Sequence, residues 1–85
     1  MNEETLRKMA KFVRATGNHK QKMARIRAVT IKHAKEIDDK DVAPLCTAFG
    51  VNASTGAEIR GALLTVREAA AYKEFDFGDQ DPEHS

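Results

Sequence analysis

The chain has 85 residues, a formal net charge of +1 and a single cysteine. This length fits one small domain, and one cysteine excludes an intrachain disulfide framework and a cysteine-based metal cluster. No apolar run reaches the ~18–20 residues of a membrane span and the N-terminus lacks the apolar core of a signal peptide, so we expect a cytoplasmic protein with no membrane partner.

The small net charge conceals a strong asymmetry between the two halves of the chain. Residues 1–36 contain ten Lys and Arg against three acids, a net charge of +7. Residues 37–85 contain four Lys and Arg against ten acids, a net charge of −6. Asymmetry of this kind indicates a polyanionic partner, an acidic tail that screens the basic half, or self-association.

Two helices are predicted in the basic half. The first spans residues 3–15 and ends at the break Thr16-Gly17-Asn18, where Asn18 is a good cap for the second helix. The second runs from His19 to about Ile37. Apolar or small residues recur on one face of each helix, namely Leu6, Met9 and Val13 in the first and Met23, Ile26 and Thr30 in the second.

Two more helices are predicted between Asp41 and Tyr72. Asp41 is the expected N-cap of the third helix, and Gly50 is its expected stop signal. Thr55 and Glu58 have capping-box spacing at the start of the fourth helix, and Ser54 is an alternative cap. Gly56 and Gly61, within the fourth helix, are interpreted as surface glycines. The predicted core of the whole chain is Leu6, Met9, Val13, Met23, Ile26, Leu45, Cys46, Phe49, Ile59, Leu63 and Val66.

These elements predict an all-α fold, a bundle of about four helices that forms one domain at residues 1–74. The segment 41–73 is a possible helix-turn-helix, because small Cys46 is followed by Gly50 and apolar Val51 at the turn. Gly56 departs from that pattern, since a branched apolar residue normally wedges the two helices there. An ordinary helical hairpin without a partner is the other interpretation of this segment.

A different fold follows if residues 25–32 form a short strand, because RIRAVTIK is rich in β-branched residues. A strand followed by helices at Asp41–Phe49 and from about Ser54 resembles the ribbon-helix-helix family, and the segment Ser54–Leu63 is similar to the start of that family's second helix. The resemblance implies a DNA-binding dimer. We keep this fold as the alternative.

Two acidic segments are predicted to lie outside the helices. Residues 38–40 form an acidic linker, and residues 75–85 form a disordered tail that is rich in acids and contains Gly and Pro. We expect the tail to be dispensable for folding.

Catalysis is not expected. His19, His33 and His84 lie on different elements, no Gly-rich phosphate loop follows a strand, and no Cys/His pair has metal-ligand spacing. We therefore predict no cofactor and no metal.

The charge pattern favours a binding protein. We predict a small nucleic-acid-binding regulatory protein, with DNA as the expected partner and a homodimer as the expected assembly. Basic side chains would contact phosphates and the start of the fourth helix would meet base edges. The predicted contact residues are Arg7, Lys11, Arg14, Lys20, Lys22, Arg25, Arg27, Thr55 and Arg60. The alternative is a protein-interaction module, such as a small inhibitor or adaptor, that binds an acidic protein surface.

Overall fold

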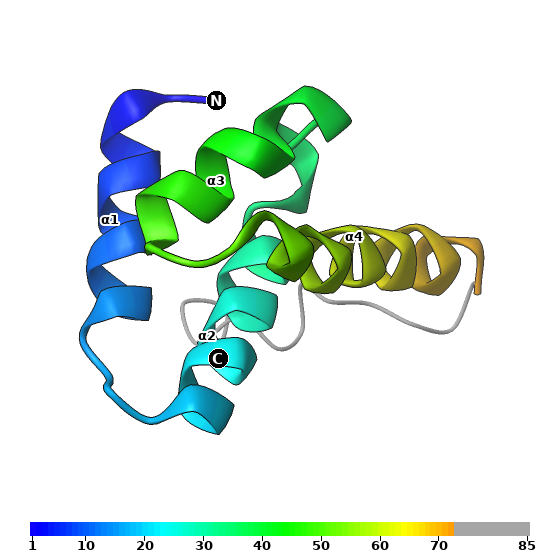
Figure 1. Cartoon of the computed structure of the whole chain (residues 1–85). Coiled ribbons are helices and arrows are strands. Elements are labelled where there is room, and N and C mark those ends of the chain that lie inside the picture. Colours follow the sequence, from blue (N-terminus) through cyan, green and yellow to red (C-terminus); the bar gives the residue numbers. More distant parts are fainter. Residues whose placement is uncertain (73–85) are drawn as a thin grey trace, which may run out of the picture.

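The computed structural model describes residues 1–72, which form four α-helices (Figure 1). No strand occurs within these residues, so the all-α prediction is confirmed and the ribbon-helix-helix alternative is wrong. The predicted acidic tail at residues 75–85 lies outside the described residues. The helices are α1 (Glu3–Arg14), α2 (His19–Lys32), α3 (Val42–Phe49) and α4 (Gly56–Ala71), with short 3-10 helices η1 (Ala34–Glu36), η2 (Asp39–Asp41) and η3 (Ala53–Thr55) between them.

The start of α1 is fixed by local hydrogen bonds and charge. The Asn2 side chain accepts a hydrogen bond from the Glu4 backbone N–H at 2.7 Å and so caps the helix. Glu3 and Glu4 occupy the first turn, where the helix dipole favours acids. The same two carboxylates lie 3.5 Å from Arg7 and 3.7 Å from Lys8, one turn further on.

The segment 25–32 is helical, although its β-branched residues also suited a strand. Asn18 caps α2 as predicted, because its side chain accepts a hydrogen bond from the Gln21 N–H at 3.0 Å. Ile26 and Thr30, one turn apart, are both fully buried, and the Thr30 hydroxyl donates to the Ile26 carbonyl at 2.7 Å. Burial along one helical face and a satisfied hydroxyl therefore outweigh the intrinsic strand preference.

The predicted second helix is too long. α2 ends at Lys32, and the chain continues through η1 so that Ile37 is buried, with 3% of its surface exposed. The predicted acidic linker is also ordered as η2. There the Asp41 carboxylate accepts a hydrogen bond from the Asp38 N–H at 2.8 Å and makes no bond of its own to the start of α3. Asp41 does occupy the N-cap position of α3, as predicted, but the prediction that its carboxylate caps the helix is wrong.

The connection from α3 to α4 depends on Gly50. This glycine ends α3 as predicted and has a φ of 69°, a left-handed conformation that disfavours residues with a side chain. The predicted capping box of Thr55 and Glu58 is wrong, because the backbone of Thr55 is already helical at the end of η3 and its side chain makes no cap bond. Glu58 is instead directed toward α2.

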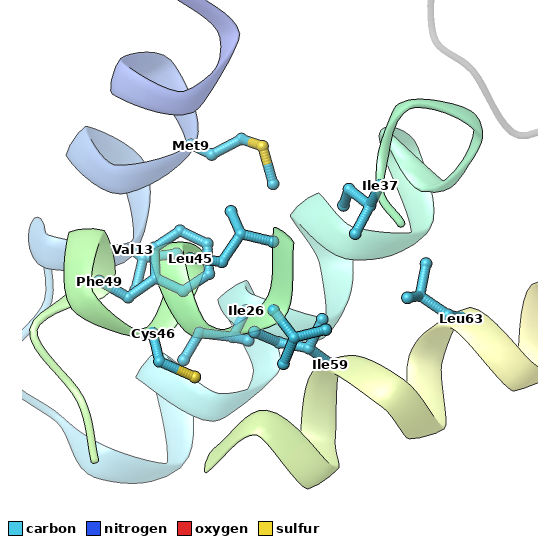
Figure 2. Packing of buried hydrophobic residues seen from close by; sticks show 10 residues of the cluster. Met9, Val13, Ile26, Ile37, Leu45, Cys46, Phe49, Ile59 and Leu63 are labelled. Carbon is cyan, nitrogen blue, oxygen red and sulfur yellow. The ribbon is translucent and has the colours of Figure 1, made fainter. Parts of the chain in front are cut away.

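The core consists of two helix pairs, since α1 packs most extensively on α3 and α2 on α4. Figure 2 shows Val13 and Leu45 beside the Phe49 ring at one end of the cluster and Ile26 against Ile59 further along, while Ile37 and Leu63 lie at the other end. Leu6, Met23 and Val66 of the predicted core are only partly buried, and the other predicted residues are buried. The predicted core omits three buried apolar residues, Ile37, Val42 and Ala62, although helical spacing places each of them on an apolar face.

The two glycines of α4 have different roles. Gly56 is buried, and a Cβ placed on it would lie 3.0 Å from Cγ1 of Val42, itself only 2% exposed. Gly56 thus permits α3 and α4 to approach closely, and its interpretation as a surface glycine is wrong. Gly61 has open space around its Cα, as expected of a surface glycine.

Replacing Phe49 by alanine is expected to lower the free energy of unfolding by about 3 kcal/mol or more. The ring is fully buried, so its removal leaves a cavity between α1 and α3. Phe12→Ala is the control, because it removes an equal ring from a position that is 45% exposed and should cost about 1 kcal/mol. Urea unfolding followed by circular dichroism measures both, and equal losses would contradict the packing described here.

Alanine substitutions at Gly56 and Gly61 are expected to act in opposite directions. Gly61→Ala should stabilise by up to about 1 kcal/mol, because alanine is the better helix former and nothing lies within 4 Å of its added methyl group. Gly56→Ala should destabilise by about 1 kcal/mol or more, because Val42 is packed and cannot move aside. Thermal melts of the two variants test this, and stabilisation by Gly56→Ala would refute the close packing of α3 on α4.

Candidate nucleic-acid interface

The helical hairpin of α1 and α2 carries an uninterrupted run of positive charge. Residues 5–35 contain ten Lys and Arg and no Asp or Glu. Eight of these cations are exposed, and Lys22 and Arg25 are half-buried. Nine of the ten lie on α1 and α2, which are joined by residues 15–18 and pack on each other, and Lys35 follows in η1.

Arg25 joins the cations of α2 to the surface of α1. One terminal nitrogen of its guanidinium donates a hydrogen bond to the Phe12 carbonyl at 2.8 Å. The guanidinium carbon lies 4.5 Å from the centre of the Phe12 ring, a cation–π contact. Phe12 is 45% exposed, so an aromatic ring with a cation on it is part of the accessible surface of the hairpin.

Arg14 fixes α1 to the end of α3. Its Nε donates a hydrogen bond to the Ala48 carbonyl at 2.7 Å, and its guanidinium lies next to Cα of Gly50. The last carbonyls of a helix lack intrahelical partners and carry partial negative charge, so a cation there is favourable.

Arg27 makes the corresponding connection between α2 and α4. Its Nε donates to Oε2 of Glu58 at 2.9 Å, and both side chains are roughly half exposed. Pairs with this exposure contribute about 0–1 kcal/mol, so the contact orients the helices more than it stabilises them. Three of the arginines predicted to contact nucleic acid therefore also link pairs of helices.

Lys11 and Lys20 are exposed on the hairpin, and Lys22 is half-buried. Within residues 1–72, Lys11, Lys20 and Lys22 have no ion-pair partner. Arg7 is paired only with Glu3 in an exposed contact. The uncompensated charge of the hairpin therefore includes Lys11, Lys20 and Lys22, whereas Lys8 is paired with Glu4.

Thr55 and Arg60 belong to a different part of the molecule. Thr55 is half-buried at the end of η3, and Arg60 is exposed on α4 with its guanidinium folded toward Gly56. α4 carries Arg60 and Arg67 against Glu58 and Glu68, so its net charge is zero. No described contact links Thr55 or Arg60 to the cations of α1.

The predicted contact residues omit three exposed cations of this surface, Lys8, Lys32 and Lys35, and the exposed ring of Phe12. Lys8 is exposed on α1, and the exposed ring of Phe12 supports Arg25. The absence of acids from residues 5–35 was the available signal for the three lysines, whereas the pairing of Phe12 with Arg25 depends on how the two helices pack.

The described residues offer few groups for other chemistry. Within residues 1–72 no three His, Cys, Asp or Glu side chains are placed to share a metal ion. His33 lies with Nδ1 3.0 Å from Oε2 of Glu36, and the thiol of Cys46 is free and buried. In the same residues, no helix combines the length and the apolar character that a bilayer crossing requires.

Comparison with known proteins gives no relative. No protein-family model matches the chain, and no curated protein or solved structure is significantly similar to it.

The structural role of Arg14 separates it from the neighbouring lysine. Arg14→Ala should lower the free energy of unfolding by about 1 kcal/mol, because it removes a charge-assisted hydrogen bond from the end of α3. Lys11→Ala removes the same charge from the same helix without breaking a described contact and should change stability by less than about 0.5 kcal/mol. Chemical denaturation compares the two, and equal effects would show that the Ala48 contact contributes nothing.

Proposed function

We propose that the protein binds nucleic acid, with DNA as the expected partner, through the exposed cations of the α1–α2 hairpin. One observation carries the proposal: residues 5–35 bring ten Lys and Arg and no acid into a single folded unit. Phosphates of the nucleic-acid backbone are the partner that such a surface suits, because neutralising them releases condensed counterions.

The size of the charge supports a polyanion. Residues 1–72 contain thirteen Lys and Arg and eight Asp and Glu, a net charge of +5. The acids of this part lie at residues 3–4 or from residue 36 onward, so the hairpin beyond its first turn has none to offset its cations. At physiological ionic strength charges act over about 8 Å, which is enough for neighbouring side chains on one hairpin to act together.

The lysines and the arginines would have different parts in this function. Lys11, Lys20 and Lys22 would supply movable charges to phosphates. Arg25, already fixed over Phe12, would present a rigid guanidinium, which can form two parallel hydrogen bonds with a phosphate. The exposed Phe12 ring adds a flat apolar surface within the same unit, suited to stacking on an unpaired base.

Base reading by Thr55 and Arg60 would require α4 to act as the recognition helix of a helix-turn-helix. The order α3, turn, α4 and the left-handed Gly50 fit such a motif. The zero net charge of α4 and the partial burial of Thr55 support it less well than the hairpin. We therefore assign the affinity for nucleic acid to the hairpin. Whether α4 adds a preference for particular base pairs is tested separately.

The expected result is binding to a random-sequence duplex that weakens steeply with salt. Lys11→Gln, Lys20→Gln and Lys22→Gln should each lower the slope of log affinity against log salt by up to about 0.9 and weaken all sequences equally. Fluorescence anisotropy of a labelled duplex at several salt concentrations measures the slopes. Replacing Thr55 or Arg60 should leave the slope of the hairpin unchanged and alter preference at one or two base pairs only if these residues read bases.

Lys40→Gln is the matched control. Lys40 is an exposed lysine in η2 between two aspartates, so its removal changes the net charge by the same amount outside the hairpin. Each of the three hairpin variants must weaken binding and lower the salt slope more than Lys40→Gln does. If the wild type binds no duplex or single strand at low salt, the proposal fails, and an acidic protein becomes the partner to seek for the hairpin.

A further inference from the structure

The solvent face of α4 carries an exposed leucine at its centre. Leu64 is 55% exposed, the most exposed aliphatic side chain among the large hydrophobic residues of the described chain. The neighbouring positions Ala57, Gly61 and Ala71 are small and exposed as well. Beside them a shallow depression of about 440 Å³ lies between α2 and α4, lined by Ile31, Gly61 and Thr65 among others. The small residues on this face leave space for another helix to approach Leu64.

Two charges on this face, those of Arg60 and Glu68, are arranged symmetrically about Leu64, whereas exposed Arg67 corresponds to Gly61. Arg60 lies four residues before Leu64 and Glu68 four residues after it, and all three side chains are exposed. At 100° per residue, these positions deviate from the direction of Leu64 by about 40° to either side. Ala57 and Ala71, seven residues before and after, deviate by only about 20°.

We propose that this face binds the same face of a second copy of the chain, with the two α4 helices antiparallel and crossing at Leu64. In that arrangement residues equally distant from Leu64 lie opposite each other. Arg60 of each copy then faces Glu68 of the other, and Ala57 faces Ala71. A two-fold axis produces both ion pairs at once, because a symmetric dimer uses the same patch twice.

Charge complementarity selects a second copy and the antiparallel direction. A parallel pair would place Arg60 on Arg60 and Glu68 on Glu68, which is repulsive. Arg27 and Glu58 beside this face are already paired with each other within one chain, so they do not compete for the Arg60–Glu68 pairs between the two copies. Lys11, Lys20 and Lys22 belong to other helical faces, so each dimer would carry two basic hairpins. This inference does not depend on the hairpin binding nucleic acid.

The contact should be weak. One pair of 16-residue helices, each about 24 Å long, buries less surface than a standard stable interface. We therefore expect a monomer–dimer equilibrium that is visible only at raised protein concentration and weakens with salt.

Sedimentation equilibrium of nucleic-acid-free protein over a concentration series tests the proposal by charge reversal. Arg60→Glu and Glu68→Arg each replace two attractive pairs by two repulsive ones, so each should raise the dimer dissociation constant about tenfold or more. The double variant restores both pairs in reverse, keeps the wild-type net charge, and should recover the wild-type constant to within about threefold. Circular dichroism confirms that these exposed substitutions leave the fold intact.

Cysteine crosslinking tests the register independently. In a Cys46→Ala background, Leu64→Cys should crosslink to itself, because the two copies meet at this residue. Ala57→Cys and Ala71→Cys should each fail to crosslink alone and should crosslink when mixed. A wild type that stays monomeric at about 1 mM overturns the proposal, and so does a double reversal that fails to rescue or a crosslink of Ala57→Cys to itself.

Discussion

The arrangement of the four helices depends on how α3 ends. α3 has only eight residues, too few to be stable as an isolated helix in water, so its formation requires tertiary packing. That packing comes from Phe49, which is fully buried against α1, and from Arg14, which donates a hydrogen bond to the Ala48 carbonyl. Gly50 then turns the chain toward α4. A short helix held at its C-terminus in this way sets where the longest helix of the fold begins.

The cations of the hairpin divide by residue type. Arg14, Arg25 and Arg27 each reach across to another helix, because a guanidinium is planar, has several donors and can bind a carbonyl or carboxylate while staying partly exposed. Lys11 and Lys20 are exposed and make no ion pair within residues 1–72, and a hydrated ammonium on a flexible stem is favourable there. The same positive charge thus assembles the bundle and remains available at its surface, so loss of an arginine and loss of a lysine are different perturbations.

Sequence analysis predicted the number and class of the helices because their signals are local. Helical spacing of apolar residues, the Asn18 cap and the stop at Gly50 each act within a few residues. Two errors are local, the capping bonds predicted for Asp41 and for Thr55 with Glu58. The other errors concern features set by contacts distant in sequence. The true end of α2, the burial of Ile37 and the close approach of Gly56 to Val42 exist only after the helices pack. For the candidate site, composition identified the basic half, whereas the use of three arginines as interhelical links follows from tertiary geometry.

Cys46 lies in the core cluster with 3% of its surface exposed, and it is the one thiol in the chain. A thiol reagent can reach it only in molecules whose helices have separated. In the slow-reagent limit, the modification rate divided by that of an accessible cysteine gives the population of open molecules, and hence the free energy of opening. The modification rate of Cys46 in the wild-type chain therefore reports the free energy of opening in water, without denaturant and without an introduced label.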